Sequence, residues 1–202
     1  MLSDLPNVLT LSRMGAIPVL VLLAALRTPA ADLAACAVFA AAAVTDWLDG
    51  HYARTRSQLS DFGRMMDPIA DKLLVAATLM MLVGERRLSD AGLFPALVIL
   101  LRELLVSGLR EFLAGRRLSL PVSRLAKWKT GVQMGALGTL LVGDAGARVL
   151  GLGFLPVSAI GEAMLWVAAG LTLLTGWDYL TAGLRQARDP ELRVRVAPGL
   201  DR

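Results

Sequence analysis

The chain has 202 residues, of which 55% are hydrophobic, and its mean hydropathy is +0.59, yet it carries 21 Lys and Arg and 17 Asp and Glu. This composition is too apolar for an ordinary soluble domain and excludes a disordered chain. A single cysteine and a single histidine exclude a disulfide framework and the common kinds of zinc site. The net charge of +4 indicates anionic partners, and in so apolar a chain a phosphorylated substrate or an anionic membrane lipid is favoured over nucleic acid.

Six apolar runs follow one another along the sequence. Five are shorter than the ~20 residues that cross a bilayer core, a length also found in buried helices of soluble proteins. Each short run, however, continues in helical phase into a segment with a few charges, which a membrane tolerates where those segments line a shared polar cavity. The sequence therefore predicts an all-α, polytopic membrane protein with six transmembrane helices around a cytoplasm-facing polar cavity. The runs are Met14–Leu26, Leu33–Val44, Leu73–Gly84, Ala91–Leu101, Gly131–Gly143 and Leu155–Gly176.

The basic residues predict the orientation of this bundle. Most of them fall on the side of the amino terminus, whereas Arg27, Arg86, Arg87 and Arg148 fall on the other side. The positive-inside rule then places both termini in the cytoplasm and the chain in the inner cell membrane, with the Arg86–Arg87 pair as the exception. We expect one membrane domain over residues 1–184 and a polar cytoplasmic tail over residues 185–202.

Four aspartates between positions 46 and 71 form two pairs. Asp46 and Asp49 lie three residues apart, and Asp67 and Asp71 lie four apart, so each pair projects from one face of a helix. The polar segment 54–66 predicts a turn at the cytoplasmic boundary, which would bring the four carboxylates together. Because four negative charges repel one another, a cation is expected among them, and oxygen-only ligands favour two Mg²⁺ or Mn²⁺ ions.

Two other interpretations of these carboxylates stay open. The aspartates could be helix caps or partners of nearby basic residues, and Asp67 before Pro68 has the form of a helix N-cap. A divalent-cation transporter would also need carboxylates within the membrane, but it would tend to place them near the bilayer centre on two symmetric halves. A single hairpin of carboxylates, with Gly50 and Ala53 leaving room for a ligand and Arg54 available for a phosphate, favours an enzyme site.

The same stretch resembles the signature of the CDP-alcohol phosphotransferase family, membrane enzymes of phospholipid synthesis. The segments 5–13, 102–110 and 126–130 are similar to the branch of this family that makes phosphatidylglycerophosphate. The resemblance implies a six-helix membrane fold, usually a homodimer, that transfers the phosphatidyl group of CDP-diacylglycerol to sn-glycerol 3-phosphate and releases CMP. The matching identities are Asp46, Asp49, Gly50, Ala53, Arg54, Gly63, Asp67 and Asp71.

The resemblance also assigns roles to individual residues. The four aspartates would bind two divalent cations, with Asp71 as the catalytic base and Asp67 as the second candidate for that role. The cytidine diphosphate group would contact residues from the signature and from the start of the chain. These residues are Gly50, Ala53, Arg54, Ser60, Gly63, Asn7, Thr10 and Arg13.

The phosphate of the acceptor requires basic residues elsewhere in the cavity, and four are candidates. Arg102 and Arg110 are eight residues apart, about 80° around a helix, so both can face one pocket. Lys127 and Lys129 are about 200° apart, and we expect only one of them to face it. Alternatively, Arg102 pairs with Glu103. The acceptor could also be another alcohol, such as inositol phosphate or phosphatidylglycerol, but this basic set disfavours serine, which has no phosphate.

Overall fold

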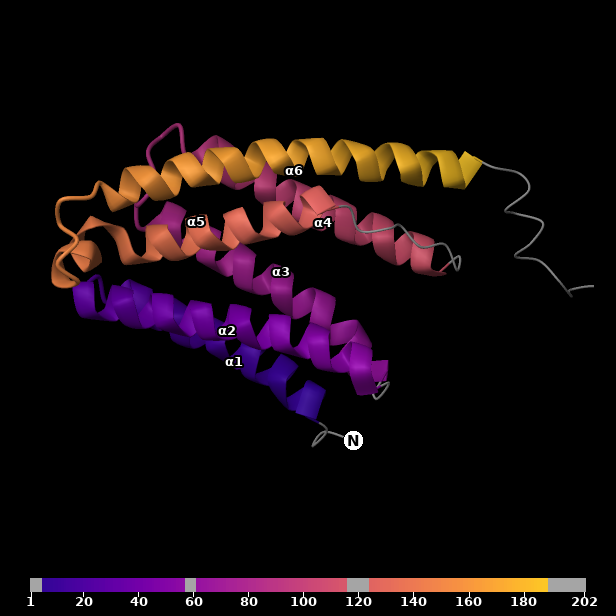
Figure 1. Ribbon diagram of the computed structural model, residues 1–202, viewed down its shortest axis with the longest axis horizontal. Helices are drawn as coiled ribbons and strands as arrows, with labels where there is room; N and C mark the ends of the chain where they lie inside the picture. The colour runs from indigo at the N-terminus through magenta and orange to yellow at the C-terminus, as the bar shows by residue number, and fades with distance from the viewer. Residues whose placement is uncertain (1–4, 57–60, 116–123, 189–202) are drawn as a thin grey trace, which may run out of the picture.

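The computed structural model describes residues 5–56, 61–115 and 124–188, and this part of the chain folds into six helices joined by short connections (Figure 1). The connections α1–α2, α3–α4 and α5–α6 lie at one end of the bundle, and the two described chain ends lie at the other (Figure 1). The helices are α1 (Leu5–Ala25), α2 (Pro29–Arg56), α3 (Asp61–Gly84), α4 (Leu93–Gly115), α5 (Arg124–Val149) and α6 (Val157–Arg188).

Each predicted apolar run lies largely within one of these helices, which confirms the all-α prediction. The helices are longer than the runs, at 21 to 32 residues, because they continue through the charged segments. A rise of ~1.5 Å per residue makes even α1 about 30 Å long. In the described residues, one stretch, Val157–Thr181 of α6, is long and apolar enough to cross a membrane, whereas Thr10–Ala25 and Pro29–Thr45 are apolar but shorter.

The predicted boundary between membrane domain and tail falls inside α6. This helix runs past residue 184 to Arg188, so the first four residues of the expected tail are helical. The remaining residues of that tail, 189–202, lie outside the described residues.

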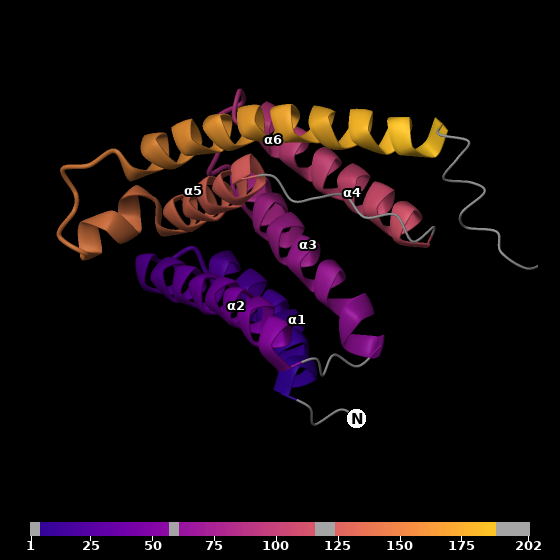
Figure 2. The same ribbon diagram turned by 45° about the vertical axis from the view of Figure 1, so that its right-hand side comes forward.

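One apolar core joins all six helices. Helix α1 packs against α2 and α3, α5 packs against α2 and α6, and α4 packs against α6 (Figures 1 and 2). Helix α3 runs obliquely between the α1–α2 pair and the other helices (Figure 2). Every helix therefore contributes side chains to the interior of the bundle. The central buried side chains, one from each helix in order, are Leu20, Phe39, Leu74, Ile99, Leu137 and Leu165.

Polar contacts join the helix connections at the end of the bundle opposite Leu5 and Arg188, the ends of the described chain. Arg87 in the α3–α4 connection pairs with Asp32 of α2 at 2.5 Å and with Glu85 at 2.9 Å. Burial acts to lower the pKa of Arg87, but the hydrogen bonds and charges of the two carboxylates outweigh it and raise that pKa above its ordinary range. Glu162 of α6, which no sequence pattern explains, accepts hydrogen bonds from the backbone N–H and the hydroxyl of Ser89.

Candidate active site

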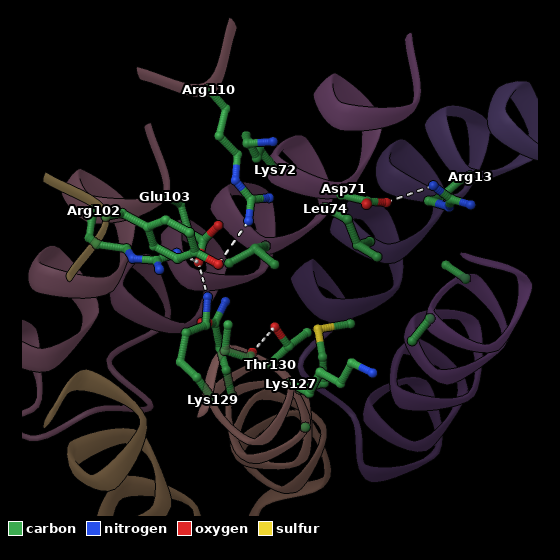
Figure 3. A pocket seen from close by; sticks show the side chains of 18 residues that line it. Arg13, Asp71, Lys72, Leu74, Arg102, Glu103, Arg110, Lys127, Lys129 and Thr130 are labelled. Atoms are coloured by element: carbon green, nitrogen blue, oxygen red, sulfur yellow. Dashed lines mark hydrogen bonds and ion pairs between the residues drawn. The ribbon is translucent and has the colours of Figure 1, made fainter. Parts of the chain in front are cut away.

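A polar pocket of about 690 Å³ lies among the helices and takes side chains from all six (Figure 3). This volume is in the range of sites for small molecules and cofactors. Six basic and two acidic side chains line it, so the pocket carries an excess of positive charge suited to a phosphorylated ligand. The charged lining residues are Arg13, Lys72, Arg102, Arg110, Lys127, Lys129, Asp71 and Glu103.

On one side of the pocket, Arg13 of α1 and Asp71 of α3 form an ion pair (Figure 3). The Nη1 of Arg13 donates to Oδ1 of Asp71 at 2.6 Å, and the packing of α1 on α3 brings these distant positions together. The Arg13 side chain is fully buried, whereas that of Asp71 is 43% exposed. Asp71 therefore presents an oriented carboxylate to the pocket, as a base or a metal ligand requires.

On the opposite side, Arg102 and Arg110 of α4 lie against α6 (Figure 3). Nη2 of Arg110 donates to the Tyr179 hydroxyl at 3.0 Å, and Nη2 of Arg102 donates to the Thr175 hydroxyl at 3.1 Å. Both guanidinium groups also lie near the Tyr179 ring, 4.9 Å from its centroid for Arg110 and 5.6 Å for Arg102. Gly176 allows the close approach, because a Cβ there would lie 3.2 Å from Cγ of Arg102. The structure thus confirms that residues eight apart on this helix share one pocket.

Glu103 links α4 to α5. Its Oε1 accepts from the buried Lys129 ammonium group and lies 3.5 Å from Nη1 of Arg102. The alternative pairing of Arg102 with Glu103 is therefore present, and it coexists with a place in the pocket. Glu103 balances part of the positive charge that the buried Lys129 and the partly buried Arg102 would otherwise leave uncompensated.

The expectation that only one of the two lysines faces the pocket is wrong. Both Lys127 and Lys129 line it, although their side chains extend to different sides of α5 (Figure 3). The pocket is wide enough to reach both sides of the helix, and Lys127, which is exposed, lies at its open margin. Angular separation on a helix limits what a narrow cleft can contact, but it does not limit a pocket that spans six helices.

The two predicted aspartate pairs lie on consecutive helices, α2 and α3. Asp46 and Asp49 lie in α2, which ends at Arg56, and Asp67 and Asp71 lie in α3, which begins at Asp61. Since α3 begins six residues before Asp67, that residue does not have the N-cap position that the alternative interpretation gave it. The side chains of Asp46, Asp49 and Asp67 lie outside the described residues.

The predicted contacts to the cytidine diphosphate group are described in part. Arg13 lines the pocket, and Thr10, one turn earlier on α1, is buried. Ser60 lies outside the described residues, and so do the side chains at Asn7, Gly50, Ala53, Arg54 and Gly63.

One carboxylate of the predicted cation site, that of Asp71, lies in the described pocket. Asp71 supplies a carboxylate to the pocket, and Asp67 lies one turn before it on α3. Oxygen donors of this kind suit Mg²⁺ or Mn²⁺. Within the described residues, no group of three or more His, Cys, Asp or Glu could hold a metal ion.

Three further residues of the pocket belong to no sequence motif above. Tyr179 is 69 residues from Arg110, and no local pattern reveals that contact. Gln133 lies one helical turn after Lys129, so a projection of α5 would have placed it on the same face. Lys72 follows Asp71 directly, and a charged residue within a predicted membrane span is the sequence signal that could have identified it as a pocket residue.

A helical fold around a pocket with an excess of positive charge is suited to an enzyme or binding protein for phosphorylated ligands. Comparisons with known proteins identify the family. A family model described as CDP-alcohol phosphatidyltransferase matches residues 3–174. A relative from Rickettsia bellii is 46% identical over 179 residues, which cover 89% of this chain and 94% of the relative. Relatives from Cereibacter sphaeroides and Bacillus subtilis are 38% and 35% identical, over 92% and 88% of this chain and 98% and 94% of their own lengths.

All three relatives are named CDP-diacylglycerol–glycerol-3-phosphate 3-phosphatidyltransferase. The chain belongs to the CDP-alcohol phosphatidyltransferase family and is an enzyme of that type. This membership confirms the family that the aspartate signature indicated.

Proposed function

We propose that this protein transfers the phosphatidyl group of CDP-diacylglycerol to sn-glycerol 3-phosphate, which yields phosphatidylglycerophosphate and CMP. The observation that carries the proposal is the basic pocket beside Asp71, which combines a site for an acceptor phosphate with a carboxylate able to take a proton. The names of the relatives support the same pair of substrates.

The acceptor phosphate binds to the basic side of the pocket. Arg102 and Arg110 present guanidinium groups held by α6, and Lys129 adds an ammonium group from α5. Guanidinium groups bind phosphate oxygens through paired hydrogen bonds, and a buried site strengthens them. Lys127 at the open margin attracts the anion on its way in.

The transfer makes one bond and breaks one. The primary hydroxyl oxygen of the acceptor attacks the phosphorus that carries the diacylglycerol, and the bond from that phosphorus to the bridging oxygen of CMP breaks. Asp71 takes the proton from the attacking hydroxyl, as a carboxylate within hydrogen-bond reach can. Arg13 holds the carboxylate in place and contacts the diphosphate together with Asn7, Thr10, Gly50, Ala53, Arg54, Ser60 and Gly63.

Two divalent cations, Mg²⁺ or Mn²⁺, are proposed at Asp46, Asp49, Asp67 and Asp71. Bound there, they would neutralise the diphosphate and stabilise the leaving CMP. The placement of the two aspartate pairs on the adjoining ends of α2 and α3 supports this site.

We propose that all six helices span the inner membrane around this pocket, with the pocket and both termini on the cytoplasmic side and residues 1–184 as one membrane domain. Large apolar side chains remain exposed on the outside of the bundle, among them Leu22 of α1, Met80 of α3 and Leu174 of α6, each more than 60% exposed. Exposed apolar side chains on this scale are typical of a lipid-facing surface or an interface between subunits. They support both membrane insertion, beside anionic lipid, and the homodimer expected for the family.

The proposed reaction is tested by incubating the purified protein with CDP-diacylglycerol, Mg²⁺ or Mn²⁺ and one alcohol at a time, and measuring released CMP. Release that depends on sn-glycerol 3-phosphate is the expected result. Release only with inositol phosphate or phosphatidylglycerol would move the protein to another acceptor, and no release with any alcohol would refute the transfer.

A further inference from the structure

Gln133 is a buried polar residue on the wall of the pocket, and the proposed reaction assigns it no role. The residue is 2% exposed, and it lines the pocket from α5. The side-chain oxygen, Oε1, accepts no hydrogen bond from any described residue. Because a buried amide oxygen without a donor is unfavourable, such a group in a pocket points to a ligand that supplies the donor.

The position of Gln133 on α5 shows which part of a ligand it can meet. It lies one turn after Lys129 on the same face of the helix. The next buried residues of α5, Ala136 and Leu137, belong to the apolar core. Along α5, Gln133 therefore lies at the boundary between the basic side chains proposed to bind the phosphate and the apolar core.

We infer that Gln133 binds the secondary hydroxyl of the acceptor, the one that does not react, and so selects a polyol phosphate; this inference rests on the proposed function. A carboxamide oxygen accepts a hydrogen bond from a hydroxyl, so a hydroxyl would satisfy Oε1 without bringing a charge into the pocket. In sn-glycerol 3-phosphate the secondary hydroxyl lies one carbon away from the phosphate ester. Side chains one turn apart begin about 5–6 Å from each other. This spacing matches a phosphate on Lys129 and the neighbouring hydroxyl on Gln133.

The test compares two acceptors in two proteins. The first acceptor is sn-glycerol 3-phosphate, and the second is 3-hydroxypropyl phosphate, which keeps the phosphate and the primary hydroxyl but lacks the secondary one. Gln133→Met keeps the length of the side chain and removes its hydrogen-bonding atoms. We expect this change to raise the KM for glycerol 3-phosphate about tenfold. The KM for 3-hydroxypropyl phosphate, the deoxy acceptor, should stay within about twofold of the wild-type value.

The deoxy acceptor gives a reading even if it reacts slowly, because its inhibition constant against glycerol 3-phosphate can replace its KM. The matched control is Thr172→Val, which also removes a fully buried oxygen that has no hydrogen-bond partner in the described structure, but outside the pocket. We expect the control to leave the KM for both acceptors unchanged. We also expect neither substitution to lower the melting temperature, since each removes an unpaired polar atom.

Equal changes in KM for the two acceptors, or no change for glycerol 3-phosphate, would overturn the inference while the activity of the wild type upholds the proposed function. A wild-type protein that does not use glycerol 3-phosphate would overturn both. If Gln133→Met does not fold, Gln133→Asn, which withdraws the amide by one methylene group, is measured in the same way with the same expected loss of selectivity.

Discussion

At the scale of single residues, the ion pair between Arg13 and Asp71 orients the carboxylate that we propose takes up the proton. The two side chains come from helices that meet only through tertiary packing, and they leave the Asp71 carboxylate partly open to the pocket. Asp71 thus combines a fixed orientation with access to a ligand, and substitutions there test catalysis more directly than substitutions at the pocket wall.

Asp71→Asn keeps the shape of the side chain and removes its ability to take a proton or hold a cation. We expect kcat to fall at least about 100-fold, in the range that general base catalysis supplies. Circular dichroism and elution in detergent should match the wild type, because the neutral amide can still accept a hydrogen bond from Arg13. Activity within a few-fold of the wild type would remove Asp71 from the reaction.

Arg110→Ala removes a guanidinium group from the acceptor side of the pocket. We expect the KM for sn-glycerol 3-phosphate to rise about 10- to 100-fold, as for the loss of a hydrogen bond to a charged group, and the KM for CDP-diacylglycerol to stay within about twofold. Arg148→Ala, an exposed arginine near the far end of α5, is the matched control and should change neither value. An equal rise for both substrates would argue against an acceptor site at Arg110.

Residues on one helix could be placed from the sequence, and contacts between helices could not. The spacing of Arg102 and Arg110 predicted their shared pocket, because both lie on α4. Their common partner Tyr179 lies on α6, and helical periodicity contains no information about which helices pack together. The same is true of Glu103, whose bond to Lys129 joins two helices across 26 residues.

At the scale of helices, close packing of α5 on α6 supports the wall of the pocket. A Cβ atom at Gly161 would lie 2.8 Å from Cγ of Leu140 and 3.2 Å from its backbone nitrogen, so only glycine fits there without a shift. Gly170, further along α6, has no such neighbour within 4 Å.

These two glycines give a matched pair of variants. Gly161→Ala should destabilise the protein by about 1–3 kcal/mol, because the added methyl group pushes the two helices apart. Gly170→Ala should be neutral or stabilising by up to about 1 kcal/mol, since alanine favours a helix. Thermal unfolding in detergent measures both, and equal melting temperatures would show that α5 and α6 do not approach as closely as the structure indicates.

The elements themselves were largely predictable. Hydrophobic runs indicated all six helices, and the polar segment 54–66 indicated a break in the helical pattern; α2 ends at Arg56 and α3 begins at Asp61. Their lengths were underestimated by the runs alone, because the charged ends of the helices line the pocket and so break the apolar pattern without ending the helix. Polar residues likewise extend α6 beyond its apolar part, as far as Arg188.

At the scale of the whole molecule, charge is sorted by position. Basic residues concentrate in the pocket, whereas at the opposite end of the bundle basic and acidic side chains lie together. Arg87, half of the pair that runs against the positive-inside rule, is paired with Asp32 and Glu85 there. The pairing lowers the cost of burying this charge, but Arg87 still counts against the predicted orientation, because Asp and Glu contribute little to the positive-inside rule.

A protease-cleavable tag after Arg202 tests that orientation. We expect added protease to remove the tag in sealed inside-out vesicles and to leave it intact in sealed right-side-out vesicles, because the proposed six spans place both termini on the same side and the proposed orientation makes that side cytoplasmic. A tag placed before Met1 should behave identically. Cleavage of the two tags from opposite sides would mean an odd number of spans.

The most direct test of the proposed chemistry is the stoichiometry of the transfer. Purified protein is supplied with CDP-diacylglycerol, Mn²⁺ or Mg²⁺ and radiolabelled sn-glycerol 3-phosphate, and both CMP and label in extracted lipid are counted. We predict one label in lipid for each CMP released, and neither product when a chelator removes the cation. CMP release without label in lipid, or transfer that persists in excess chelator, would contradict a metal-dependent phosphatidyl transfer to glycerol 3-phosphate.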